Sequence, residues 1–310
     1  MEGTQPSPLP SRHKIIQAYQ DSLWSAAKSP ASWLFLLLWL TATIYIAIFT
    51  NIGIIPYLEL AAYMVIISLL TIALTPESNI LPSLPTRCSQ RQLWLQLAVL
   101  LIIILLTGYR GMILQPGVPT SWQLPVIYPI LALLHHLPNG LANPLLYFVL
   151  PVCCLLPLGA SWKELGFEPG YRSWLVTLLW NFLPLILLII GLLGGAFTFL
   201  ALIVNVIQNA LLNGFFEEFL MRGALMTRLN YLFGTTWSIV LSSLIFGFWH
   251  IGVQMVSFDN NFWLGLATTI LGQATIGLGL AVILQRTRNL LASSIFHVVL
   301  DTASSLKVIP

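Results

Sequence analysis

Charged side chains are scarce in this sequence. Its 310 residues include 13 Lys and Arg and 10 Asp and Glu, so 7% are charged, whereas a soluble domain carries roughly 25%. Hydrophobic residues make up 57% of the chain. The net charge of +3 is small and spread over the ends of apolar runs, which argues against the basic surface of a nucleic-acid-binding protein. The composition predicts a polytopic membrane protein without a soluble domain of any size.

Cysteine is also scarce, and the N-terminal residues do not show the pattern of a signal peptide. The three cysteines, Cys88, Cys153 and Cys154, form an odd set with an adjacent pair inside an apolar run. This pattern argues against a disulfide framework and has no zinc-site spacing. The polar N-terminus lacks the compact layout and small-residue cleavage site of a signal peptide. We expect residues 1–30 to be a loosely ordered cytoplasmic arm, with a cleaved organelle-targeting peptide as the alternative.

Long apolar runs fill most of the chain. A helix needs about 20 apolar residues to cross a bilayer. The stretch 174–213 is about twice that length, so we place a turn near Gly194. Residues 126–137 are apolar within a connection rich in Pro and Gly, where a re-entrant segment is an alternative. The sequence predicts an all-α bundle of about 8–9 transmembrane helices, over residues 33–49, 57–75, 93–107, 144–158, 174–194, 194–228, 236–255, 262–284 and 290–306.

The basic residues predict the orientation of the chain. Most arginines and lysines fall in connections on one side of the bundle, and positive charge marks the cytoplasmic side. The N-terminus is then cytoplasmic, with Arg110 and Lys307 as exceptions. We expect an N-terminal transmembrane region at 31–160 and a second one at 161–310. The protein is expected in a bacterial inner membrane or an organelle membrane.

Three groups of polar residues interrupt the last four apolar runs. An ionisable residue inside a membrane-length segment costs at least a few kcal/mol and points to a functional site. Glu218 and Arg222 share a helix face, whereas Glu217 lies about 100° around the helix and lacks that partner. The unpaired Glu217 is therefore the candidate reactive group. The three groups are Glu217, Glu218 and Arg222; Phe246 and His250; and His297 and Asp301.

The three groups fall at similar depths. Counted from the basic ends of their helices, Glu217, His250 and His297 lie roughly 14–21 Å into a bilayer core of about 30 Å. Each residue has a structural alternative: a membrane histidine commonly forms an interhelical hydrogen bond, an ion pair can be purely structural, and Asp301 can serve only to orient His297. Together, in segments nearly free of charge, they predict a functional site.

Three ordered motifs resemble the CPBP family of intramembrane endopeptidases, which includes the type II CAAX prenyl endopeptidases and many bacterial Abi-type proteins. The motifs are EEFLMR at 217–222, FGFWH at 246–250 and HVVLD at 297–301, and the family pattern is EExxxR, FxxxH and then HxxxN or HxxxD. The segment WKELGF at 162–167 resembles an element upstream in many relatives. The resemblance covers about 161–306, so we expect 161–310 to form a CPBP-like protease domain.

The resemblance implies hydrolysis of a peptide bond inside the membrane, in a conical cavity open toward the cytoplasmic half. It implies that Glu217 and His250 hold and activate a water, and that His297 and the residue at 301 stabilise the oxyanion. An unpaired carboxylate suits a general base, and a histidine N–H can donate to an oxyanion. The expected catalytic set is Glu217, Glu218, Arg222, His250, His297 and Asp301, with Phe246 packed beside it.

Asp301 departs from the asparagine of the eukaryotic prenyl endopeptidases, because an ionised aspartate cannot donate a hydrogen bond. Asp301 is protonated, or accepts from His297 and orients it, or binds a cation. This departure keeps a zinc-dependent alternative open, in which Glu217, His250 and His297 hold Zn²⁺. No HExxH motif is present, so we expect the metal-free glutamate mechanism without a cofactor.

The expected partners are membrane lipid and a membrane-anchored peptide or protein substrate. A prenylated CAAX protein is one such substrate and a bacteriocin is another; nucleic acid is not expected, and the oligomeric state is left open. Two other function classes compete, a non-catalytic membrane scaffold and a transporter that relays protons. A transporter predicts inverted repeats and interrupted helices in both halves, whereas all three polar groups lie in the last third of this chain.

Overall fold

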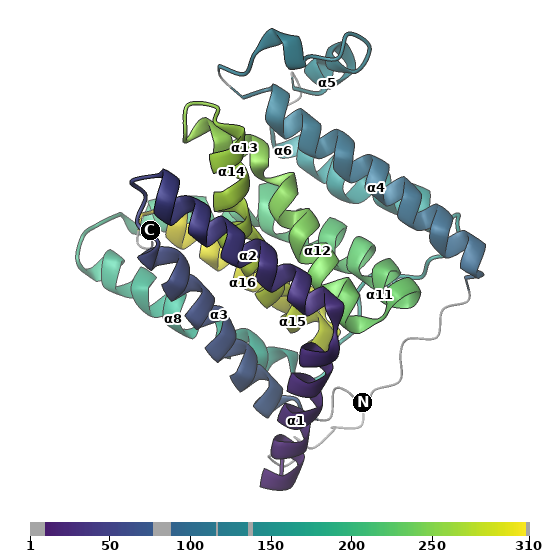
Figure 1. Ribbon diagram of the computed structural model, residues 1–310, viewed down its shortest axis with the longest axis vertical. Helices are drawn as coiled ribbons and strands as arrows, with labels where there is room; N and C mark the ends of the chain where they lie inside the picture. The colour runs from purple at the N-terminus through teal and green to yellow at the C-terminus, as the bar shows by residue number, and fades with distance from the viewer. Residues whose placement is uncertain (1–9, 77–87, 116, 136–138, 308–310) are drawn as a thin grey trace.

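The computed structural model describes residues 10–76, 88–115, 117–135 and 139–307, and every regular element in them is helical (Figure 1). The predicted all-α membrane bundle is therefore confirmed. In the described residues, seven helices are long and apolar enough to cross a membrane. Two shorter apolar helices accompany them, Leu141–Leu155 and Leu290–Ser305 (α16). Those seven are Pro30–Phe49 (α2), Ile55–Leu74 (α3), Gln90–Ile113 (α4), Ser173–Leu193 (α8), Phe199–Phe233, Thr235–Val256 and Phe262–Thr287.

Short helices connect α4 to α8 and subdivide some of the spans. The predicted re-entrant stretch holds one of them, and residues 136–138 lie outside the described part. The connecting elements are η2 (Thr120–Trp122), α5 (Ile127–His135), α6 (Asn139–Pro144), η3 (Leu145–Val149) and α7 (Leu150–Leu155). The span at 235–256 divides into α12 (Thr235–Trp249) and α13 (Ile251–Val256), and the span at 262–287 divides into α14 (Phe262–Thr269), η6 (Ile270–Ala274) and α15 (Thr275–Thr287).

The arm expected to be loosely ordered contains a helix, α1 (Arg12–Lys28). Tyr19 donates to the carbonyl oxygen of Leu69 in α3 at 2.9 Å, and Ser22 accepts from Arg286 Nη2 at 2.7 Å. These bonds dock α1 on the bundle, so the expectation of loose order is wrong over this range. The helix is polar on average, and the stripe on its inward side, formed by Ile15, Ala18, Tyr19 and Ser22, is short and only partly apolar, so the sequence signal for it was weak.

The turn predicted near Gly194 is present. α8 ends at Leu193 and Gly195 has φ of +74°, a left-handed conformation that glycine adopts without steric cost. Thr198 then caps the next helix, because its hydroxyl accepts from the Ala201 N–H at 3.1 Å. The helical span that starts there extends from Phe199 to Phe233.

π-helical turns interrupt this long helix twice. Such turns are rare and frequent at functional sites, since the extra residue locally changes the direction of side chains. Two of them flank the short α10, which carries both glutamates, and η3 and η6 are two more in the described residues. In order, the helix consists of α9 (Phe199–Asn209), the π-helical η4 (Ala210–Gly214), α10 (Phe215–Glu218), the π-helical η5 (Phe219–Met226) and α11 (Thr227–Phe233).

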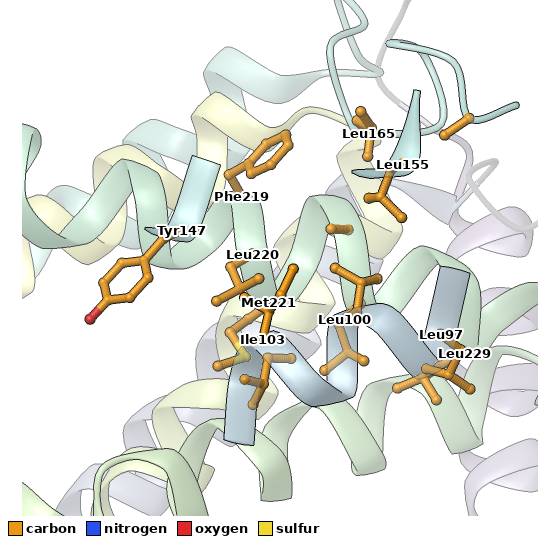
Figure 2. Close-up of a cluster of buried hydrophobic side chains, with 14 of the residues drawn as sticks. Leu97, Leu100, Ile103, Tyr147, Leu155, Leu165, Phe219, Leu220, Met221 and Leu229 are labelled. Atoms are coloured by element: carbon orange, nitrogen blue, oxygen red, sulfur yellow. The ribbon is translucent and has the colours of Figure 1, made fainter. Parts of the chain in front are cut away.

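A tightly packed core forms where α4 lies against η5. Leu100 and Ile103 of α4 lie beside Leu220 and Met221 of η5 (Figure 2), and all four are at most 5% exposed. Lipid tails are as apolar as these side chains, so close packing, not exclusion of water, holds the helices together. Gly223 illustrates this packing, since a Cβ there would lie 2.6 Å from the carbonyl oxygen of residue 165.

Basic residues gather at one end of the bundle. Arg228 of α11 donates to Gln96 near the start of α4 at 2.9 Å. Arg286 near the end of α15 donates to Ser22 of α1, and Arg172, just before α8, donates to the last carbonyl of α3 at 2.7 Å. These helix ends therefore lie on one side, as the charge pattern predicts. That this side is cytoplasmic stays a prediction, and so do the region boundaries at 30 and 160.

Candidate active site

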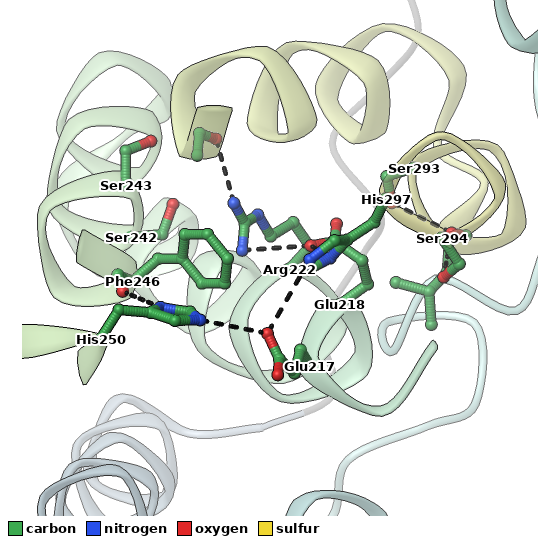
Figure 3. A network of polar contacts seen from close by, with 12 residues as sticks. Glu217, Glu218, Arg222, Ser242, Ser243, Phe246, His250, Ser293, Ser294 and His297 are labelled. Carbon is green, nitrogen blue, oxygen red and sulfur yellow. Dashed lines mark hydrogen bonds and ion pairs between the residues drawn. The ribbon is translucent and has the colours of Figure 1, made fainter. Parts of the chain in front are cut away.

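The predicted site residues meet around Glu217 of α10. Glu217 Oε2 lies 3.6 Å from Nε2 of His250, at the end of α12, and 3.9 Å from Nε2 of His297 in α16 (Figure 3). The Glu217 residue is 7% exposed. Three separate helices thus bring one carboxylate oxygen opposite two imidazole rings.

Glu218 belongs to a fully buried ionic cluster. Its Oε1 lies 3.2 Å from Arg222 Nη1, and neither side chain has exposed surface. The same oxygen lies 3.2 Å from Nδ1 of His297, and Arg222 Nη2 donates to the carbonyl oxygen of Gly277 at 3.2 Å. The predicted i,i+4 pair is confirmed, and Glu217 is the carboxylate left without an arginine partner.

The hydrogen-bond partners indicate where the imidazole protons lie. His250 Nδ1 is 2.8 Å from the carbonyl oxygen of Phe246, which can only accept, so Nδ1 carries a proton. In the neutral ring, His250 Nε2 then presents its lone pair toward Glu217. His297 differs, because Nδ1 faces Glu218 and Nε2 faces two further carboxylates. Three carboxylates face the nitrogens of His297, against one at His250, and this concentration of negative charge favours a His297 ring with an N–H on each side.

Phe246 provides the surface on which these groups pack. Its ring centroid lies 4.5 Å from that of His250 and 5.7 Å from that of His297, both edge-to-face. The Arg222 guanidinium carbon lies 4.3 Å from the same ring, a cation–π contact that contributes about 0.5–2 kcal/mol. At 2% exposure, Phe246 fixes the positions of its neighbours, in agreement with its predicted place beside the site.

Asp301 lies one helical turn after His297 and reaches its outer side. Asp301 Oδ2 is 3.6 Å from His297 Nε2, and the aspartate side chain is 30% exposed, against 5% for the histidine. This separation exceeds a direct hydrogen bond. Of the three sequence-based options, orientation of His297 fits this contact best, through the attraction of the carboxylate for the facing ring nitrogen rather than a direct hydrogen bond.

Two cavities share Glu217 and His250 in their walls. The first has a volume of about 280 Å³ and also holds His297 and Asp301. The second has a volume of about 400 Å³. The motifs did not identify several polar or aromatic residues of these walls, because they lie on other helices or carry no motif: Asn209, Asn213, Gln273, Ser304 and Ser305 in the first, and Thr107, Arg110, Asn143, Tyr147 and Trp249 in the second. Trp249 is itself a residue of the FGFWH motif, so the sequence could have identified it.

Both cavities lead away from the basic end of the bundle. The first extends from Asp301 to the exposed Ser305 at the end of α16, and the second extends from His250 to Gln115, just past the end of α4. The arginines of α11 and α15 lie at the opposite ends of the helices. A basic end in the cytoplasm and a cavity open toward the cytoplasm are therefore incompatible, so one of these two predictions is wrong.

The three residues expected to bind zinc, if any metal is used, are Glu217, His250 and His297. Their donor atoms are of the kinds that zinc accepts, but tetrahedral ligands at 2.0–2.1 Å from zinc are roughly 3.3 Å apart. The carboxylate oxygen here lies 3.6 and 3.9 Å from the two nitrogens. Among the described residues no three His, Cys, Asp or Glu side chains group as around a metal ion. As arranged, these three side chains do not fit a zinc ion.

The last third of the chain matches a known family model. Residues 199–303 match the model described as type II CAAX prenyl endopeptidase Rce1-like. The match includes all three motifs, from Glu217 to Asp301. No curated protein and no solved structure matches the chain. The family match and the seven candidate membrane helices indicate a multi-pass membrane protein with a protease of the CAAX type.

Proposed function

Because residues 199–303 form an Rce1-like domain, consistent with the CPBP family of CAAX proteases, we propose that this protein is an intramembrane endopeptidase in which Glu217 and His250 activate a water. The observation that carries the proposal is one oxygen of a buried carboxylate 3.6 and 3.9 Å from imidazole nitrogens of two other helices. Glu217 also lines both cavities, so a substrate in either one reaches it.

The attacking water lies beside the Glu217–His250 pair. A separation of 3.6 Å is too long for a direct hydrogen bond, but a water at about 2.8 Å from each atom fits against both. The carboxylate and the Nε2 lone pair of neutral His250 both accept, so the water donates both protons and its own lone pairs face the substrate. As the water oxygen bonds to the carbonyl carbon, Glu217 takes one proton and later delivers it to the leaving amine. General-base catalysis of this kind contributes about 10²–10⁴-fold.

His297 is the proposed donor to the oxyanion. With an N–H on Nε2 it can donate to the carbonyl oxygen as negative charge develops, and loss of one such donor costs about 10²–10³-fold in kcat. Glu218, at 3.2 Å from Nδ1, and Asp301, at 3.6 Å from Nε2, hold the ring from its two sides. Glu218 and Arg222 are thus positioning residues, because neither lines the cavities.

We propose a substrate that is itself held in the membrane, such as a prenylated peptide of the CAAX type. The reactive carboxylate lies in the middle of a 35-residue apolar helix, so a substrate peptide bond has to enter the bilayer to reach it. Glu217 lies beside two cavities whose walls carry polar side chains, and these provide partners for the peptide groups that leave water. Membrane lipid is the second proposed partner, and neither a metal nor another cofactor is proposed.

The test uses the purified protein in proteoliposomes with a farnesylated CAAX peptide, and mass spectrometry to detect the released fragment. Wild type is expected to cleave the peptide, and Glu217→Gln is expected to be slower by about 10²–10⁴-fold. Glu59→Gln is the matched control, because Glu59 is exposed on α3 and lines neither cavity. Equal cleavage by wild type and Glu217→Gln, or none by wild type, would contradict the proposal.

A further inference from the structure

Arg110 is a buried basic residue that the proposed mechanism does not use. It lies near the end of α4, is 8% exposed, and its Nε has no hydrogen-bond partner. In the described ranges no carboxylate forms an ion pair with its guanidinium, which lies beside the hydroxyl of Tyr147. A buried arginine without a counter-ion is unfavourable, and an anionic group of a ligand would supply the missing charge.

Arg110 lines the same cavity as the reactive pair. This cavity of about 400 Å³ also contains Glu217 and His250 in its wall, and its size is typical of a ligand site. Trp249 connects the two ends, because its Nε1 donates to Thr107 Oγ1 at 2.9 Å and its ring lies edge-to-face 5.0 Å from His250. Thr107 and Arg110 are three residues apart and share a face of α4. A ligand that fills the cavity therefore reaches from the guanidinium to the reactive carboxylate.

We propose that Arg110 binds the free C-terminal carboxylate of the peptide substrate and so selects bonds close to a chain end. The inference rests on the proposed endopeptidase function. A guanidinium offers a planar fork of N–H donors that matches a carboxylate bidentately. The leaving-group side of the scissile bond then extends through the second cavity from Glu217 to Arg110. The acyl side, with its membrane anchor, occupies the first cavity beside His297 and Asp301. Arg110 is in this sense a specificity-determining residue.

Three quenched-fluorescence peptides test this assignment. Each carries an S-farnesyl cysteine; the first ends in a free acid, the second is its carboxamide, and the third is a carboxamide with glutamate as its last residue. Wild type is expected to cleave the acid with a kcat/KM at least ~30-fold above both amides, as for truncation of a buried charged contact. Arg110→Gln is expected to lose that factor on the acid and to leave the amides unchanged. Arg91→Gln is the matched control, because Arg91 is exposed near the start of the same helix.

The ratio of acid to amide rates is measured on one preparation, so partial loss of folded protein does not change it. Equal rates in wild type, an undiminished preference in Arg110→Gln, or equal cleavage of the glutamate peptide would overturn the inference and leave the endopeptidase function standing. If wild type cleaves none of the three peptides, that result contradicts the proposed endopeptidase function instead. Binding then tests Arg110 alone, with the acid and amide peptides titrated into Glu217→Gln with and without Arg110→Gln. A stronger Kd for the acid that requires Arg110 supports the inference, and equal Kd values refute it.

Discussion

Glu218→Gln removes the charge of one partner of the buried ion pair and keeps the size of the side chain. Glu218 Oε1 and Arg222 Nη1 are 3.2 Å apart and neither side chain is exposed. After the substitution, the contacts of the guanidinium include the Gly277 carbonyl at 3.2 Å and the Phe246 ring at 4.3 Å. Neither contact carries a full negative charge, so Arg222 keeps only the weaker attraction of Glu217 and becomes a buried and largely uncompensated cation.

The expected magnitude follows from that loss. Removal of one partner of a buried pair costs about 3–5 kcal/mol in folded proteins. We expect the lower end, about 3 kcal/mol, because an unfolded state inside the membrane also finds polar partners. The measurement is the free energy of unfolding in a reversible SDS titration of the protein in lipid–detergent micelles.

Two comparisons make the result specific to the pair. Glu217→Gln removes a carboxylate that has no arginine partner, and it is expected to change the free energy of unfolding by less than about 1 kcal/mol. Glu218→Gln combined with Arg222→Met is expected to recover more than half of the loss, because an apolar replacement of the whole pair is often neutral. A Glu218→Gln protein within about 1 kcal/mol of wild type would refute the reasoning.

Three further outcomes are expected. Asp301→Asn is expected to keep kcat within about tenfold of wild type, because the amide can still hold His297. Asp301→Ala is expected to lower kcat by about 10–100-fold, as for other lost outer-shell partners. Equal kcat values in the two variants would contradict the orienting role. Gly277→Val is expected to lower the free energy of unfolding by about 1–3 kcal/mol, because even a Cβ there would lie 3.1 Å from Ser243 Cα and 3.3 Å from Arg222 Nη2. Calorimetry or an SDS titration measures this change, and an unchanged free energy of unfolding would argue against the close approach. Dialysis against EDTA and a zinc-specific chelator is expected to leave the rate of peptide cleavage unchanged, and loss of activity that added zinc restores would contradict the metal-free mechanism.

The ionisable residues were the part of the site that could be predicted from the sequence. Each one is costly inside a bilayer, so its position stands out, and i,i+4 spacing fixes which groups share a face. That reasoning predicted the Glu218–Arg222 pair and the meeting of Glu217 with His250 and His297, all of which the structure brings together. The spans and the turn at Gly194 followed from run length alone.

Other features had no local signal. The π-helical turns around α10 depend on packing, and the second cavity is built from residues of distant helices, among them Thr107 and Tyr147. The direction of the cavities relative to the basic end also needed the three-dimensional structure. Labelling of single cysteines in place of Ser305 and Arg288, from each side of the membrane, decides which of the two conflicting orientation predictions is wrong.

Mass spectrometry of the reconstituted protein with the farnesylated peptide tests the central claim most directly, with wild type and His250→Ala compared at equal amounts of folded protein. The account predicts a single new fragment from hydrolysis of one internal peptide bond with wild type and little or none with His250→Ala. An intact peptide with wild type, or the same fragment at the same rate with His250→Ala, would contradict it.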